Sequence, residues 1–191
     1  AQHLRTVADR EAAIRHAASL VRAAQASITS AGMACPIVTG AGTGSFVHEA
    51  ASGVWNELQC GSYVFMDRDY ADNEAAPQAP AFVKSQVMSR GSSHAVVDAG
   101  HKSHAIDSGL PRVWSPGVGK LDLEFANGGD EHGILRPHGD ALPALGASVW
   151  LVPGHCDPTV NLHDHFIAVR GGLAHGVGEA VWPVDARGRS D

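Results

Sequence analysis

The stretch Cys35-Pro-Ile-Val-Thr-Gly-Ala-Gly-Thr-Gly-Ser45 joins a short apolar run to a glycine-rich loop. We predict a strand over Cys35–Thr39 that runs directly into the loop Gly40–Ser45. Before it, residues 7–31 carry isoleucine, valine and alanine at helical spacing and predict one long amphipathic helix. A second strand is predicted at Ser62–Met66. The order helix, strand, glycine loop is typical of an α/β barrel or a doubly wound sheet.

The two ends of the predicted helix carry recognisable signals. Thr6 with Asp9 resembles a capping pair at its start, and Gly32 is expected to end it. The apolar stripe repeats at seven residues along its length, through Ile14, Val21 and Ile28, with Ala17, Ala18 and Ala24 between them. Such a stripe is expected to pack closely against a sheet.

The rest of the chain has a different texture. Residues 71–81 are predicted to form a linker. Beyond it, short β-like runs alternate with Gly, Pro and Asp turns and predict a small β-barrel or sandwich. The runs are Phe82–Ser89, Ser93–Asp98, Gly119–Phe125, Ser148–Val152, Phe166–Arg170 and Glu179–Pro183.

These segments define the predicted fold class, which is α/β plus β. Residues 1–75 are too few to close an eight-fold barrel, which needs roughly 250 residues. We therefore predict that they are the C-terminal portion of a (β/α)8 barrel, followed by a small β domain over residues 76–191. The chain lacks an initiator Met and opens directly into a helix, so we expect a processed product or a fragment.

The composition excludes several classes of protein. The net charge is −6, from 14 Lys and Arg against 20 Asp and Glu, which argues against a nucleic-acid binder. No apolar run reaches 18 residues, so no membrane span or membrane partner is expected. The three cysteines are odd in number and far apart in sequence, which fits a reducing compartment and predicts a cytoplasmic protein.

The strongest local motif is Pro153-Gly-His-Cys-Asp-Pro-Thr-Val-Asn-Leu-His-Asp164. In an extended segment His155 and Asp157 point to the same face, with Cys156 on the other. An imidazole and a carboxylate on one face make half of a site for Mn²⁺ or Zn²⁺. The alternative is a polar turn in which His155 and Asp157 merely pair, and spacing alone favours that alternative.

The glycine loop is the second candidate site. Gly42 and Gly44 let the backbone approach an anion closely, Thr43 and Ser45 supply hydroxyls, and successive N–H groups can cradle a phosphate. The loop does not match a P-loop, because no Gly-Lys-Ser/Thr closes it. A flexible turn is the alternative.

Three further segments are weaker candidates. Ser62 and Tyr63 could add donors to the same phosphate, although a core strand with a capped end explains them as well. The turns Asp98–Lys102 and Asn127–Gly133 are expected to be solvated loops. Lys102 could enter an ion pair there, and the second turn could add a metal ligand or a substrate contact.

Several segments in one order resemble the D-threonine aldolase/D-serine dehydratase family. These are pyridoxal-phosphate enzymes of the alanine-racemase-like fold, with an α/β barrel followed by a β domain. The segments are Thr39–Ser45, Asn56–Gln59, Gly61–Asp67, Asp98–Gly100 with Lys102, Asp107–Pro111, Glu131–Gly133 and Pro153–Leu162.

The resemblance implies a cofactor site and a metal site. The cofactor phosphate is expected at Gly42, Thr43 and Gly44, with Ser62 and Tyr63 close by. The resemblance implies that His155 and Asp157 are catalytic residues and ligands of a divalent metal, Mn²⁺ or Zn²⁺ with Mg²⁺ as a further option. A carboxylate at position 157 is typical of the aldolase branch, whereas the dehydratase branch has a thiolate there.

The implied activity is a metal-activated lyase that cleaves D-3-hydroxy amino acids, for example D-threonine to glycine and acetaldehyde. A dehydratase acting on D-serine or D-3-hydroxyaspartate is the alternative within the family. A racemase of the same fold, which needs no metal, and a non-catalytic domain that binds a metal or a phosphate ligand are two more. A homodimer is expected only by analogy with fold relatives.

The chain departs from the family at two places. None of Lys84, Lys102 and Lys120 matches the Schiff-base lysine, which the family carries on the first barrel strand. We therefore expect a fragment of a longer enzyme that is inactive by itself. Ala41 stands where glycine is common in the family, and this change is expected to be tolerated.

Overall fold

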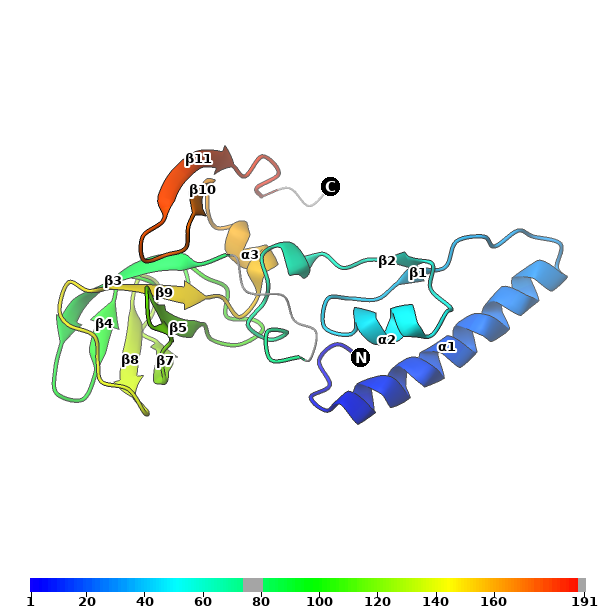
Figure 1. The fold of residues 1–191 in the computed structure, drawn as a ribbon, viewed down its shortest axis with the longest axis horizontal. Helices are drawn as coiled ribbons and strands as arrows, with labels where there is room; N and C mark the ends of the chain where they lie inside the picture. Colours follow the sequence, from blue (N-terminus) through cyan, green and yellow to red (C-terminus); the bar gives the residue numbers. More distant parts are fainter. Residues whose placement is uncertain (74–80, 189–191) are drawn as a thin grey trace. The chain divides into compact units, whose positions relative to one another are not determined.

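The computed structural model describes residues 1–73 and 81–188. The chain divides into two compact units, residues 1–66 with 70–78 and residues 67–69 with 79–191 (Figure 1). Of the predicted linker 71–81, residues 74–80 lie outside the described residues. Asn73 belongs to the first unit, where its side chain accepts from Arg10 Nη1 at 3.3 Å and donates to the carbonyl of Gly44 at 2.9 Å.

Helix α1 of the first unit spans Val7–Ser30. The Thr6 hydroxyl accepts from the Asp9 N–H at 3.1 Å and donates to the Asp9 carboxylate at 2.6 Å, which closes the predicted cap. Gly32 lies at φ +77°, the left-handed conformation in which helices commonly stop. The predicted helix and both of its end signals are confirmed. Its most buried residues are Arg10, Ile14 and Ala18.

The rest of the first unit is less regular than predicted. Strand β1 (Thr39–Gly40) pairs in parallel with β2 (Glu57–Leu58), so only the last residue of the predicted strand Cys35–Thr39 is in a ladder. Helix α2 (Phe46–Ala51) follows the glycine loop and was not predicted. Its six residues are too short for a helical period to show.

The prediction of a strand over Ser62–Met66 is wrong. Ser62–Val64 form one turn of 3-10 helix, η1, and the N–H groups of Phe65 and Met66 both donate to the Ser62 carbonyl. Met66 then takes φ +55°, which turns the chain away from an extended path. Valine and aromatic residues favour strands, but here local hydrogen bonds satisfy the backbone.

The second unit contains a seven-stranded sheet in the order β6-β5-β9-β3-β4-β8-β7, and every neighbouring pair is antiparallel. Strand β5 also contacts β7, which lies at the other end of that order, so the sheet curls. The bounds are β3 Val83–Arg90, β4 Ala95–Val97, β5 Arg112–Ser115, β6 Gly119–Lys120, β7 Leu123–Asn127, β8 Gly133–Pro137 and β9 Ser148–Val152.

The curled sheet encloses the core of this unit. The core side chains are Val87, Ala95, Val97, Ala99, Val113, Phe125, Leu135, Leu142, Val149 and Leu151. Strands β10 (His165–Arg170) and β11 (Val177–Pro183) form a separate antiparallel hairpin. None of the described helices is long and apolar enough to span a bilayer.

All six predicted β-runs overlap strands, and the run Gly119–Phe125 divides into β6 and β7. Strands β5 and β8 were not predicted, and neither was helix α3 (Cys156–Val160). These elements have four or five residues each, so they offer little periodicity to read.

Candidate functional site

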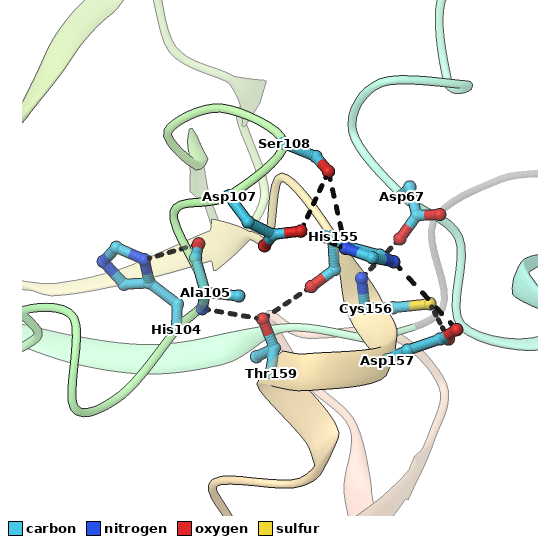
Figure 2. A network of polar contacts seen from close by, with 9 residues as sticks. All are labelled: Asp67, His104, Ala105, Asp107, Ser108, His155, Cys156, Asp157 and Thr159. Atoms are coloured by element: carbon cyan, nitrogen blue, oxygen red, sulfur yellow. Dashed lines mark hydrogen bonds and ion pairs between the residues drawn. The ribbon is translucent and has the colours of Figure 1, made fainter. Parts of the chain in front are cut away.

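His155 and Asp157 lie at the start of helix α3 rather than in an extended segment. His155 is the N-cap residue, with φ −138° and ψ 120°, and Asp157 is in the first helical turn. The predicted strand geometry is therefore wrong. The two side chains still face each other, with 4.0 Å between His155 Nε2 and Asp157 Oδ2 (Figure 2). Cys156 does not point away, because its thiol donates to Asp157 Oδ1 at 3.3 Å.

The other ring nitrogen of His155 is held by a carboxylate. Nδ1 lies 2.6 Å from Asp107 Oδ2 and 3.4 Å from the Ser108 hydroxyl. With Asp107 ionised, Nδ1 carries the proton and donates it, so the neutral ring presents a lone pair at Nε2, toward Asp157. This is the tautomer that a metal ligand needs when it binds through Nε2.

The charges around His155 shift the pKa values of both partners. The hydrogen bond from His155 lowers the pKa of Asp107. Burial acts to lower the pKa of His155, but the hydrogen bond and charge of Asp107 outweigh it, and Asp67 and Asp157 add to the same effect, so the net shift is upward. The surroundings therefore favour the protonated ring, and a bound metal would have to compete with that proton.

The backbone at His155 is held as firmly as its ring. The His155 carbonyl accepts from the Thr159 hydroxyl at 2.7 Å, and the same hydroxyl accepts from the Ala105 N–H at 3.0 Å. Gly154 packs directly on the carbonyl of Gly109, because a Cβ at Gly154 would lie 2.1 Å from that oxygen. The loop that carries Asp107 therefore lies against the residue that precedes His155.

Asp67 and Cys156 complete this network. The carboxylate of Asp67 accepts from the backbone N–H of Cys156. Burial, followed by the nearby Asp67 and Asp157, strongly raises the pKa of the Cys156 thiol. These surroundings favour the protonated form of the Cys156 thiol.

His155 and Asp157 fit a divalent metal as two ligands of a larger set. Within residues 1–73 and 81–188 no three His, Cys, Asp or Glu side chains gather in a way that could hold an ion. Neighbouring ligands of an octahedral ion bound at about 2.1 Å are about 3 Å apart. The 4.0 Å separation must therefore shorten by about 1 Å. The Asp157 side chain is 74% exposed, so it has room to rotate.

The glycine loop fits a phosphate. Thr43 is only 7% exposed, and its hydroxyl has no hydrogen-bond partner among the described residues. In the same part of the chain, the backbone N–H groups of Gly42, Thr43 and Gly44 donate no hydrogen bond. These three N–H groups and one hydroxyl are a donor set that an anion could use.

Residues that the sequence did not point to also contact the loop. A Cβ at Gly42 would lie 1.9 Å from Gln2 Oε1, and one at Gly44 would lie 2.8 Å from Tyr70 Cδ1. The glycines therefore have a packing role as well. Tyr70 lies next to the predicted linker 71–81, and Asn73 lies within it. The polar, proline-containing composition of that stretch gave no sign that these residues contact the loop.

Ser62 and Tyr63 lie on the η1 turn rather than on a strand. Tyr63 is 52% exposed, and neither side chain makes a hydrogen bond within the described part of the chain. The structure thus does not join them to the glycine loop, and their contact with the phosphate stays a prediction.

The two polar turns bind each other. Lys102 Nζ lies 3.1 Å from Glu131 Oε1, and His101 Nε2 lies 2.9 Å from Asp130 Oδ1, which confirms the ion pair of Lys102. Gly100 allows the close approach, because a Cβ there would lie 2.3 Å from the carbonyl of Gly129. These contacts account for the charged residues of both turns as partners in ion pairs between the turns.

Comparison with known proteins identifies the family. Residues 80–169 match the family described as the putative serine dehydratase domain. The chain is 41% identical to a 3-hydroxy-D-aspartate aldolase from Paracoccus denitrificans (strain Pd 1222), over 98% of this chain and 49% of that protein. It is 42% identical to a D-threonine aldolase from Arthrobacter sp, over 99% of this chain and 49% of that protein.

The chain belongs to the D-threonine aldolase/D-serine dehydratase family. The crystal structure of D-threonine aldolase from Filomicrobium marinum superposes with a TM-score of 0.85 at 46% identity, over 98% of this chain and 50% of that one. This confirms the predicted fold class, the C-terminal part of an α/β barrel followed by a small β domain. The chain spans about half the length of these family members.

Proposed function

We propose that the protein carrying this chain is a metal-activated, pyridoxal-phosphate-dependent lyase that cleaves D-3-hydroxy amino acids, such as D-threonine, to glycine and an aldehyde. The observation that carries the proposal is the position of His155, whose Nε2 faces Asp157 while Asp107 holds Nδ1. The names of two relatives at 41% and 42% identity, both aldolases of D-3-hydroxy amino acids, support it.

In the proposed reaction the hydroxyl on Cβ loses its proton and the Cα–Cβ bond breaks. The electron pair of that bond goes to Cα, the aldehyde leaves, and Cα takes up a proton to give glycine. A divalent ion held by His155 and Asp157 would act as a Lewis acid on the hydroxyl oxygen. Pyridoxal phosphate, when bound, supplies the electron sink for the carbanion at Cα.

The residues of the chain would divide this work between two segments. In residues 1–75, Gly42, Thr43 and Gly44 would hold the cofactor phosphate through their N–H groups and the Thr43 hydroxyl. Ser62 and Tyr63 are proposed as further donors. In residues 76–191, the start of α3 would hold the metal.

Two parts of the proposal concern the whole protein rather than this chain. The Schiff-base lysine of the family has no match among Lys84, Lys102 and Lys120, so cleavage is proposed for the protein that carries this chain. A homodimer is also proposed, by analogy with the fold.

The test compares Asp157→Ala with Asp164→Ala in the full-length protein loaded with pyridoxal phosphate and Mn²⁺. Asp164 is an exposed carboxylate nearby in sequence that pairs with Arg187, so it controls for the loss of one negative charge. With D-threonine, Asp157→Ala should lower acetaldehyde release by at least about 100-fold, because a Lewis acid contributes several kcal/mol. Asp164→Ala should stay within about twofold.

The products also decide between the two branches of the family. Glycine and acetaldehyde indicate the aldolase, whereas a keto acid and ammonia would indicate the dehydratase. Equal turnover by wild type and Asp157→Ala, or turnover that survives a chelator, would refute the metal role.

A further inference from the structure

A buried carboxylate lies against the peptide unit that links the two proposed metal ligands. Asp67 is 2% exposed and accepts a hydrogen bond from the backbone N–H of Cys156, the residue between His155 and Asp157. We propose that Asp67 is a positioning residue for this pair. The proposal rests on the metal site proposed above and adds to it a residue 89 positions away in the chain.

The first step concerns the orientation of one peptide plane. A peptide unit is planar, so its C=O and N–H groups point in opposite directions and turn together. In the unit between His155 and Cys156, the carbonyl accepts from the Thr159 hydroxyl at 2.7 Å, and the N–H donates to Asp67 (Figure 2). Both polar groups of this unit are therefore held, and the plane cannot rotate without breaking a bond.

The second step connects that plane to the ligands. His155 is extended, and the helix starts at Cys156, so the backbone direction changes sharply at this peptide. The directions of the side chains at 155 and 157 both depend on it. The residue after Asp67 also holds the backbone that precedes His155, because the Arg68 N–H donates to the Pro153 carbonyl at 2.9 Å.

The third step concerns why a carboxylate would be kept here. Among the residues that the structure describes, Asp67 forms no ion pair. Burying a carboxylate without a cation costs free energy unless hydrogen bonds compensate it. A hydrogen bond from a backbone N–H to a carboxylate is among the stronger ones. The hydrogen bond from the Cys156 N–H therefore offsets part of the free energy of burying the Asp67 carboxylate, and the same bond fixes the backbone of the proposed site.

The experiment measures Mn²⁺ affinity by electron paramagnetic resonance titration of the full-length protein, well below the unfolding temperature of each variant. Asp67→Ala removes the acceptor and should weaken binding by about 10- to 100-fold, the usual loss for an outer-shell partner. Asp67→Asn keeps an oxygen that can accept from the same N–H, in a weaker neutral hydrogen bond, and should bind Mn²⁺ at least about threefold more tightly than Asp67→Ala. This partial rescue would not be expected if only the charge of Asp67 mattered.

Two further variants complete the comparison. Asp67→Glu keeps the charge but displaces the carboxylate by one methylene, so it should weaken Mn²⁺ binding, and it decides the question if Asp67→Ala does not fold. His155→Ala is the reference for a lost ligand.

The outcomes distinguish this inference from the proposed function. If His155→Ala binds Mn²⁺ as tightly as wild type, the proposed metal site is wrong and the role of Asp67 falls with it. If His155→Ala loses binding while Asp67→Ala and Asp67→Glu keep it, only the positioning role is overturned. It is also overturned if Asp67→Asn binds as weakly as Asp67→Ala.

Discussion

Replacement of Gly154 by alanine should show how tightly the loop of Asp107 is packed against the metal-ligand pair. The added Cβ would lie 2.1 Å from the Gly109 carbonyl oxygen, whereas real Cβ contacts are essentially never below 3.0 Å. The two backbone segments must therefore separate by about 1 Å. The 2.6 Å contact between Asp107 and His155 would then lengthen to about 3.6 Å, beyond a hydrogen bond.

The magnitude follows from two contributions. Overpacking of a close contact costs about 1–3 kcal/mol, and a half-exposed ion pair adds at most about 1 kcal/mol. Together they should lower the free energy of unfolding of Gly154→Ala by about 1–4 kcal/mol. Loss of the Asp107 contact should also weaken Mn²⁺ binding by about tenfold or more.

The assay is urea unfolding of the full-length protein together with Mn²⁺ titration. Gly91→Ala is the matched control, because a Cβ there meets only the His94 carbonyl at 3.7 Å, an ordinary contact. It should change stability by no more than about 0.5 kcal/mol. If Gly154→Ala were as stable as Gly91→Ala and bound Mn²⁺ like wild type, the packing argument would be refuted.

Three further predictions concern single residues. Ala41 has φ +72°, so Ala41→Gly should raise the free energy of unfolding by about 0.5–1 kcal/mol. The control Ala50→Gly in helix α2 should lower it by about 1 kcal/mol. If urea unfolding gave the same change for both variants, it would count against strain at position 41. Asp107→Asn should lower the pKa of His155 in an NMR titration, because the hydrogen bond and charge of Asp107 hold it up, and an unchanged pKa would contradict the pairing. His104 is fully buried, and burial lowers its pKa. The unfolded chain then binds more protons, so stability should fall as the pH drops below about 6.5 and level off below the lowered pKa. Urea unfolding of His104→Gln should show a flatter slope from pH 7 to 5, and an identical slope would remove His104 as its source.

The sequence predicted the elements whose signals are local. Helix α1 is capped by residues three positions apart, and β9 coincides with the predicted run Ser148–Val152. The segment Ser62–Met66 was predicted wrongly, although the contacts that decide its conformation are also local. Its residue types favour a strand, but hydrogen bonds to the Ser62 carbonyl and the turn at Met66 decide its conformation.

The candidate site shows a different limit, which is separation along the sequence. His155 and Asp157 stand out because they are two positions apart in a distinctive motif. Asp107 and Asp67 lie 48 and 89 positions from the residues that they contact, so no spacing rule connects them. Both nevertheless lie in segments that carry the family resemblance, and that was the available signal.

The most direct test of the proposed metal site is an anomalous difference map from crystals of the full-length protein with Mn²⁺. The account predicts a peak bound by both His155 Nε2 and Asp157, with Asp107 still bonded to Nδ1. A peak elsewhere, or no peak at this position at saturating Mn²⁺, would contradict it.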